Sequence, residues 1–315
     1  MMTFLSLALS GSACGGPIRA NDNGPQEEGG TAAGSEVYMT RTITPEALVR
    51  IYEALDRKAA GRVAVKLSTG EPGGHNFLQP ALIAPLVKKV DGTIVECNTA
   101  YGGGRARTAD HLKAAANHGF TAIAPVDIMD AEGEATLRVE GGRHLKEDYV
   151  GKNFLDYDFT VVLSHFKGHA MGGFGGSMKN IAIGLASGRV GKRQVHGVVD
   201  KIPESWTDWP MKEPFMELMV DSAKATLDYF GKHVTFINVL RRMSVDCDCA
   251  GVTAAEPTIP DIGILASTDL LAIDQASVDL VFNHESNKDL VERMTSRHGL
   301  RQLSGMAEKK MGNPQ

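Results

Sequence analysis

The residues best suited to chemistry lie close together, between residues 158 and 197. An apolar run at 159–163 predicts a buried strand, and a glycine-rich turn at 172–176 follows it. Imidazole titrates near neutral pH, and a lysine can bind an anion or act covalently where its pKa is depressed. We therefore expect a catalytic group of His169, Lys179 and His165, and a ligand held by Lys167 and Asn180.

A second glycine-rich loop, at 102–104, stands between a predicted strand and a helix that Thr108 caps. Backbone N–H groups at a helix N-terminus bind anions, and an arginine can donate two parallel hydrogen bonds to a carboxylate or phosphate. We expect this loop to hold the carboxylate or phosphate of a small molecule, through the residues Arg105, Gly103, Gly104, Thr69 and Glu71. The alternative is a mobile glycine loop with exposed polar neighbours. The loop matches neither common nucleotide-binding fingerprint, so nucleotide binding has little support.

A pair of cysteines, Cys247 and Cys249, flanks a single aspartate. Their thiolates could bind a soft metal ion, with His196 as the third candidate ligand. They could also stand at the edge of an iron–sulfur cluster shared with a partner, although a cubane cluster takes four ligands. The alternative is a pair of thiols without a metal, open to oxidation. The four cysteines of the chain do not form a disulfide framework.

Alternating strands and helices are expected to position these residues. The pattern predicts strands at 62–67, 93–96, 121–125, 159–163, 233–240 and 261–266, and helices at 44–55, 77–90, 108–117, 212–229, 270–282 and 287–298. Residues 130–155 predict a hairpin with a connector, and the tail from Leu303 predicts no regular structure. The alternation predicts an α/β fold with a largely parallel sheet flanked by helices, which could form two α/β lobes. Ligands of such folds bind beyond the carboxyl ends of the strands.

The first 35 residues differ from the rest of the chain. Residues 1–13 are apolar and precede Cys14, like the core of an export signal before a lipid-modified cysteine. Residues 15–35 have the composition of a flexible tether. We expect one α/β region at 36–315, in which a lobe boundary could fall near 200–210. The predicted location is the cell envelope, with membrane contact only through a lipid anchor; the alternative is a cytoplasmic protein.

The overall composition narrows the range of partners. The net charge is −5 and no basic block occurs, so we expect no nucleic-acid partner. Hydrophobic residues make up 43% of the chain, which is enough for a sizeable core. A small anionic molecule is therefore the expected partner.

Two segments resemble the domain-of-unknown-function family 362. They are S-H-F-K-G-H-A-M-G-G-F-G-G-S-M-K-N-I-A-I-G at 164–184 and I-P-D-I-G-I-L-A-S-T-D-L-L-A-I-D-Q-A at 259–276, and G-E-P-G-G-H and C-D-C-A-G fit a bacterial branch. The resemblance covers about residues 36–285. Members of this family often carry a ferredoxin module with C-x2-C-x2-C-x3-C-P, which implies an iron–sulfur cluster or a ferredoxin-type redox partner. This sequence has no such run.

The segment H-A-M-G-G-F-G-G-S-M-K is also distantly similar to the H-F-F-A-G-F-S-G-G-R-K motif in the N-terminal domain of lactate racemase. That resemblance implies a nickel-pincer nucleotide held by Lys179, proton transfer by His169 and a nickel ligand at His196. The sequence therefore predicts a racemase- or isomerase-like enzyme. The alternatives are an iron–sulfur or metal-associated redox protein that lacks its own ferredoxin module, and a lipid-anchored small-molecule binding protein.

Overall fold

The structure is a computed structural model that describes residues 34–199, 203, 205 and 208–314. The predicted signal segment and its Cys14 lie outside the described residues. In the described part of the chain, no helix combines the length and the apolar character needed to cross a membrane.

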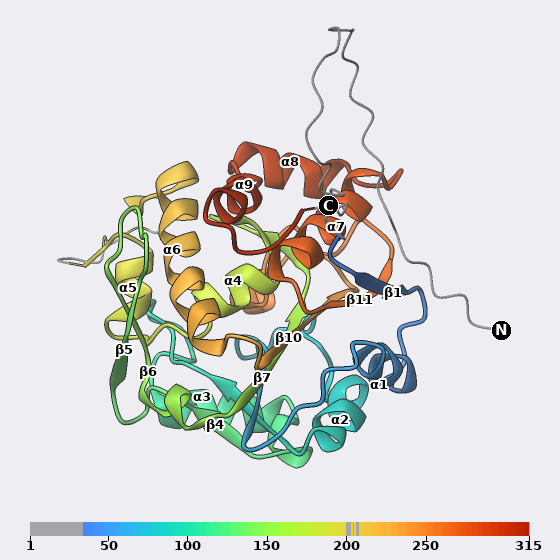
Figure 1. The fold of residues 1–315 in the computed structure, drawn as a ribbon, viewed down its shortest axis with the longest axis horizontal. Helices are drawn as coiled ribbons and strands as arrows, with labels where there is room; N and C mark the ends of the chain where they lie inside the picture. Colours follow the sequence, from blue (N-terminus) through green and yellow to red (C-terminus); the bar gives the residue numbers. More distant parts are fainter. Residues whose placement is uncertain (1–33, 200–202, 204, 206–207, 315) are drawn as a thin grey trace, which may run out of the picture.

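A seven-stranded sheet in the order β1-β11-β10-β7-β2-β3-β4 forms the centre of the molecule (Figure 1). Its strands are β1 (Val37–Thr40), β2 (Val63–Lys66), β3 (Gly92–Glu96), β4 (Val126–Ile128), β7 (Phe159–His165), β10 (Val234–Leu240) and β11 (Gly263–Ser267). The five strands from β10 to β4 are parallel, whereas β11 is antiparallel to both β10 and β1. The predicted α/β fold with a largely parallel sheet is confirmed.

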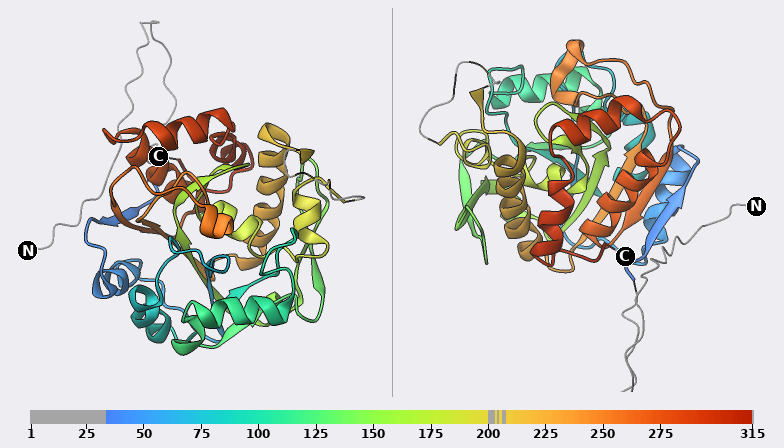
Figure 2. Two further views of the ribbon diagram at one scale, coloured as in Figure 1. Left: turned by 180° about the vertical axis from the view of Figure 1, so that it is seen from behind. Right: turned by 90° about the horizontal axis from the view of Figure 1, so that it is seen from above.

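Helices cover both faces of this sheet (Figures 1 and 2). One face packs against α1 (Pro45–Glu53), α2 (Pro80–Lys89) and α3 (Thr108–Asn117). The other packs against α4 (Ser177–Ala182), α5 (Gly191–Val195), α6 (Lys212–Phe230), α7 (Leu270–Phe282), α8 (Lys288–Ser296) and α9 (Arg301–Glu308). Side chains of a strand alternate between faces, so in β7 Val161 and Leu163 join the first core and Val162 the second.

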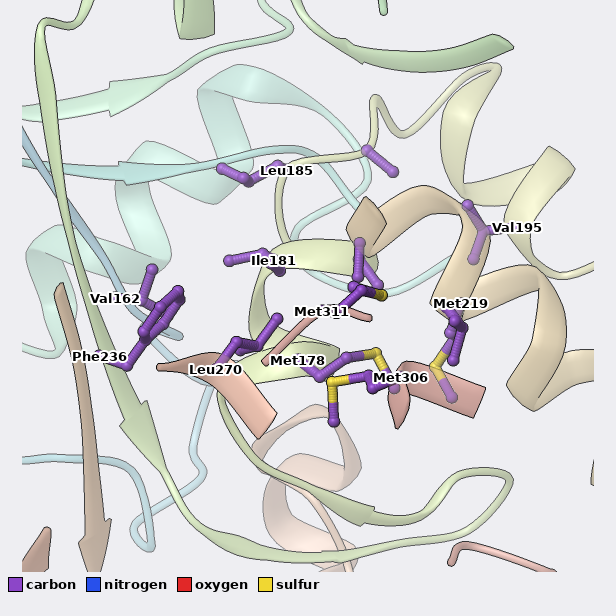
Figure 3. Close-up of a cluster of buried hydrophobic side chains, with 14 of the residues drawn as sticks. Val162, Met178, Ile181, Leu185, Val195, Met219, Phe236, Leu270, Met306 and Met311 are labelled. Carbon is purple, nitrogen blue, oxygen red and sulfur yellow. The ribbon is translucent and has the colours of Figure 1, made fainter. Parts of the chain in front are cut away.

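The core around α4 is rich in methionine. Met178, Met219 and Met306 belong to the same hydrophobic cluster as Val162 and Phe236 of the sheet (Figure 3). Methionine is flexible and fills irregular gaps, which suits a helix as short as α4. Because the buried side of α4 is fixed in this core, the rest of the helix is held in place.

Two smaller hairpins complete the fold. One pairs β5 (Glu134–Arg138) with β6 (Glu147–Gly151), as the sequence of residues 130–155 predicted. The other pairs β8 (Lys167–His169) with β9 (Gly173–Gly175), so the glycine-rich turn is a tight hairpin directly before α4. Gly173 has a φ of 76°, and a Cβ there would lie 2.8 Å from Gly299 Cα, so only glycine lets the hairpin close.

Two secondary-structure predictions are wrong. Residues Phe120–Ala122 form a 3-10 turn after Gly119, and the strand begins only at Val126. Pro125 accepts a hydrogen bond from Ile94 N but has no N–H to give, so regular pairing starts after it. The tail is also ordered: α9 forms, and it buries Leu303 and Met306.

The carboxyl group of Asp148, in β6, is a buried acid outside the site described below. It is 0% exposed, and its one hydrogen bond from a side chain comes from Ser222 Oγ at 3.0 Å. Burial raises its pKa to about 7. The folded pKa lies above the unfolded value, so this group costs stability as the pH rises from about 4 to about 7.

We expect Asp148→Asn to stabilise the protein by about 2 kcal/mol at pH 8, and by progressively less toward pH 4. Urea unfolding at several pH values measures this. Asp156→Asn is the control, because that side chain is 57% exposed. A pH-independent difference between Asp148→Asn and the wild type would contradict the assignment.

Candidate functional site

A cavity of about 140 Å³ lies at the carboxyl ends of four neighbouring strands, β10, β7, β2 and β3. Residues from β2, β3 and β7 line it together with the loop that follows each strand, with the 3-10 turn Asp248–Thr253 after β10, and with α4 and α5. Polar residues at the ends of several strands meet here.

Positive charge dominates the wall of this cavity. Five cations line it, against the two carboxylates Glu96 and Asp248: Lys66, Arg105, Lys167, Lys179 and Lys192. The net charge of the protein is −5, so this concentration of cations does not reflect the composition as a whole. A buried group of like charges is costly unless a counter-charge joins it. The cavity is therefore suited to an anion.

Lys179 is the cation least compensated by the protein. Its ammonium group has no hydrogen bond or ion pair with any other described residue, and α4 places it on the cavity wall. Burial, together with the nearby charges of Lys167 and Lys66, lowers the pKa of Lys179 to about 7. At neutral pH a large share of this side chain is therefore a free amine.

Lys66 and Lys192 are fixed by backbone oxygens. Lys66 Nζ donates to Leu67 O at 2.6 Å and to Asn180 Oδ1 at 3.0 Å, and Lys192 Nζ donates to Ala186 O at 2.7 Å. Burial lowers the pKa of Lys66 to about 8 and also lowers that of Lys192. Asn180, a predicted ligand residue, thus holds Lys66 in place.

The hydrogen bonds of His169 fix its tautomer. Nδ1 accepts from the backbone N–H groups of Met171 at 3.2 Å and Gly172 at 2.8 Å. A neutral imidazole that accepts at Nδ1 carries its proton on Nε2. Burial and the charge of Lys179 keep the pKa of His169 well below its ordinary value. His169 therefore offers a neutral N–H donor to the cavity.

His196 has the opposite tautomer. Its Nδ1 donates to Lys192 O at 2.6 Å, so Nε2 keeps a free lone pair. The ring packs against Phe215 and Trp209, and burial lowers its pKa to about 4. A backbone carbonyl on Nδ1 is the usual arrangement for a histidine whose Nε2 binds a ligand.

His165 and Lys167 are tied to one carboxylate. Asp248 accepts from His165 Nδ1 at 2.9 Å and from Lys167 Nζ at 2.8 Å, and His165 Nε2 donates to Arg241 O at 2.7 Å. Burial alone would raise the pKa of Asp248, but the charges of His165 and Lys167 lower it below its ordinary value. Both nitrogens of His165 are engaged, so this ring positions Asp248 and offers no free lone pair for catalysis.

The predicted anion-binding loop holds an anion of the protein itself. Glu71 accepts from Gly104 N at 2.9 Å, from Arg105 Nε at 2.9 Å and from Tyr101 Oη at 3.0 Å. Arg105 also donates to Glu96 at 3.2 Å. The loop does bind a carboxylate, but Glu71 occupies it, so Arg105 is not free to hold a substrate.

The remaining predicted ligand residues lie beside the cavity. Thr69 N donates to Glu96 Oε1 at 2.5 Å, and Thr69 O faces His118 Nδ1 at 2.7 Å. Thr69, Glu71, Gly103 and Gly104 do not line the cavity, whereas Lys167, Asn180, His165, His169, Lys179 and His196 do. The glycine loop supports the wall and the hairpin residues form it.

Cys247 and Cys249 form a disulfide that lines the same cavity. Their sulfurs and one ring nitrogen of His169 lie within 4.8 Å of one another, which is compact enough for a metal ion among the described residues. The histidine in this group is His169, and His196, which we expected as the third ligand, lies elsewhere on the cavity wall. As a disulfide, the sulfurs carry no thiolate, so a ligand role applies only to the reduced pair.

Of the two cofactors suggested by resemblance, the cubane cluster does not fit the residues of this cavity. A cubane cluster needs four ligands, but the described cysteines on the wall are Cys97, Cys247 and Cys249, and burial raises the pKa of the Cys97 thiol to about 12. Cofactor sites usually span about 300–1,000 Å³. The cavity of about 140 Å³ is open to solvent, so a nucleotide cofactor would have to extend beyond it.

Sequence reasoning missed several residues of the site, namely Lys66, Glu96, Lys192 and Asp248. Lys66 and Glu96 each stand at the end of an apolar strand, where a charged side chain is unusual. Both are now seen to be buried, at 1% and 5% exposure. The charged residue at the end of each apolar strand was the signal that could have identified Lys66 and Glu96.

Comparisons with known proteins bear on the fold and the family. The family model described as "Domain of unknown function (DUF362)" matches residues 63–279. No curated protein matches. The structure is similar to the lactate racemase apoprotein from Thermoanaerobacterium thermosaccharolyticum, with 13% identity, a TM-score of 0.43, and coverage of 77% of this chain and 56% of that one.

A second solved structure, of a protein from Thermotoga maritima, has 13% identity and a TM-score of 0.37. The match covers 62% of this chain and 49% of that one. The chain thus spans about half the length of these two structures.

Proposed function

This chain belongs to the family described as "Domain of unknown function (DUF362)", and we propose that it is an enzyme that binds a small carboxylate or phosphate in its cationic cavity and moves a proton on it. The observation that carries this proposal is the set of four cations that line the cavity with Lys179, whose amine has no partner among the described residues. Racemisation or isomerisation is the class of reaction that such a site serves.

Lys179 is the proposed proton acceptor. A base works best when its pKa lies near the working pH, and the pKa of Lys179 is about 7. An amine in this state can take a proton from a carbon next to a carboxylate or carbonyl. The neighbouring charges of Lys66 and Lys192 stabilise the negative charge that develops on the substrate.

His169 is the proposed hydrogen-bond donor. Its Nε2–H is fixed by the two backbone N–H groups on Nδ1, and the ring stays neutral at physiological pH. A neutral imidazole can donate to the oxyanion that forms when the proton leaves the substrate. Lys179 and His169 therefore divide the work: one accepts the proton, and the other stabilises the oxygen.

Binding and turnover can be tested separately. Phosphate and oxalate should raise the melting temperature of the wild type, because a ligand that binds only the folded state stabilises it. Binding at pH 8 should take up protons, since a bound anion raises the pKa of Lys179. Calorimetry in buffers of different ionisation enthalpy measures that uptake. Stabilisation without any proton uptake would count against Lys179 as the titrating group.

Turnover is tested by deuterium exchange. NMR in D₂O should show exchange at C2 of a 2-hydroxy acid or at C3 of a 2-keto acid, in one of a panel of these acids and their phosphorylated analogues. Lys179→Met and His169→Phe should each slow this exchange by about 100- to 10,000-fold. Lys113→Met, on the exposed side of α3, is the matched control. Equal exchange in Lys179→Met and Lys113→Met would refute the proposed base.

The second candidate is a metal-associated redox protein, which the proximity of His169 to the two cysteines favours. The tautomer of His169 argues against it, because neither ring nitrogen has a free lone pair. Nδ1 accepts from backbone N–H groups, and Nε2 carries the proton. A ferredoxin-type partner, a lipid anchor at Cys14 and an envelope location stay predictions from the sequence. Elemental analysis of the reduced protein tests this candidate.

A further inference from the structure

The disulfide between Cys247 and Cys249 adds little as a structural link. The two residues are two positions apart, so the bond closes a very short loop. The stabilisation that a disulfide gives rises with the length of the loop that it closes. We therefore consider the chemistry of this disulfide, which lies on the wall of the cationic cavity.

Other contacts hold the two cysteines in place. Asp248, between them, is buried and accepts from His165 and Lys167. A backbone hydrogen bond also holds the loop, in which Ala250 N donates to Cys247 O at 2.9 Å. Because these contacts do not involve the sulfur–sulfur bond, the loop is expected to keep its conformation when the bond is broken.

The surroundings of the two sulfurs are unequal. Cys247 is 7% exposed and its Sγ accepts from Cys249 N at 3.2 Å, whereas Cys249 is only half-buried. Lys167 and Lys179 line the same cavity, and a ring nitrogen of His169 lies within 4.8 Å of both sulfurs. Cationic neighbours and N–H donors favour a thiolate. Cys249 is thus the sulfur open to attack, and Cys247 the better leaving group.

We propose that Cys247 and Cys249 form a redox-active pair that undergoes thiol–disulfide exchange with dithiols. A thiolate of the dithiol attacks Cys249 Sγ, the sulfur–sulfur bond breaks, and the electron pair leaves on Cys247 Sγ. The second thiol of the dithiol then loses its proton and attacks the dithiol's own sulfur in the mixed disulfide, and the electron pair of the broken bond leaves on Cys249 Sγ. The dithiol is oxidised to its own disulfide, and the pair takes up two electrons and two protons when both sulfurs are protonated.

Reduction changes the charge of the cavity wall, and this consequence rests on the proposed function. A disulfide is neutral, but a Cys247 thiolate adds a negative charge beside Lys167 and Lys179. That charge competes with the bound anion for the same cations. The reduced protein should therefore bind phosphate about three- to tenfold more weakly than the oxidised protein.

Differential alkylation with peptide mass mapping tests the exchange without any anion. The full chain is equilibrated in oxidised glutathione and then treated with dithiothreitol under native conditions, so that thiol–disulfide exchange can occur. We expect Cys247 and Cys249 to be reduced and alkylated at least about 100-fold faster than Cys97, which is buried with its pKa raised to about 12. Reduction only in denaturant, or a pair that stays dithiol in oxidised glutathione, overturns the proposal.

The effect on the cavity is tested with a double variant, Cys247→Ser with Cys249→Ser. Phosphate affinity should differ between oxidising and reducing buffer in the wild type and stay constant in this variant. If alkylation shows that the pair exchanges but phosphate does not bind, the redox pair is supported and the proposed function is refuted. If the exchange is complete but the phosphate affinity is the same in both redox buffers, the proposed link between the redox pair and anion binding is refuted.

Discussion

Replacement of Lys179 by methionine should make the protein more stable at neutral pH while removing its response to anions. The wild type holds this amine on the wall of a cavity that contains four other cations. Burial and those charges lower its pKa to about 7, from an ordinary value near 10.5. Methionine has nearly the same length and carries no charge, so it relieves both costs.

The sign of the pH dependence follows from that pKa. Between about pH 7 and pH 10 the unfolded chain keeps the proton of Lys179 and the folded protein has lost it. Stability of the wild type therefore rises with pH in this window, and part of that rise should vanish in Lys179→Met. The expected gain at pH 7 is about 2–4 kcal/mol, since one pKa unit corresponds to about 1.4 kcal/mol.

Urea unfolding at pH 7 and pH 10 measures this gain for Lys179→Met against Lys113→Met. The control removes an exposed lysine and should change the free energy of unfolding by less than about 0.5 kcal/mol. A destabilised Lys179→Met would mean that the amine has a compensating partner and that the cavity is not poised for an anion.

Replacement of Arg105 by methionine should have the largest effect of the opposite sign. Arg105 is 4% exposed and pairs with Glu71 at 2.9 Å and Glu96 at 3.2 Å, both of them buried. Its loss leaves two carboxylates without their common partner. Removal of one member of a buried ion pair costs about 3–5 kcal/mol.

The neighbouring Arg107 is the matched control. Its side chain is 82% exposed and pairs with Asp110 on the surface of α3, so Arg107→Met should cost less than about 1 kcal/mol. Arg105→Lys should restore little of the loss, because a lysine cannot donate to Glu71, Glu96 and Tyr101 in the fixed planar arrangement of a guanidinium. Equal stability losses in Arg105→Met and Arg107→Met, measured by urea unfolding, would contradict this account.

The sheet could be predicted from sequence because its signal is local. Short apolar strands alternate with helices, and α3 and α7 occur at the predicted residues, although α3 starts after Arg107 and lacks the side-chain cap that we expected from Thr108. The failures have physical reasons too. β4 starts later than predicted because Pro125 cannot donate a hydrogen bond to the sheet. α9 is stabilised by the packing of Leu303 and Met306 onto the core, which is a tertiary effect.

The site was only partly predictable. The hairpin between His169 and Lys179 is local, so the sequence identified both residues. The tautomer of His169, the fully engaged ring of His165 and the pairing of Arg105 with Glu71 depend on residues that are distant along the chain. Charge compensation of that kind cannot be inferred from spacing.

The pairing of β1 with β11 has a consequence for how the chain folds during synthesis. Val37 lies opposite Ser267, so β1 cannot pair until β11, more than 220 residues later in the chain, has been synthesised. Until β10 emerges, β7 is an unpaired edge although all seven of its residues are buried in the finished protein. Such an edge invites pairing with other chains. We expect slow folding, dependence on chaperones, and aggregation of fragments that end before β10.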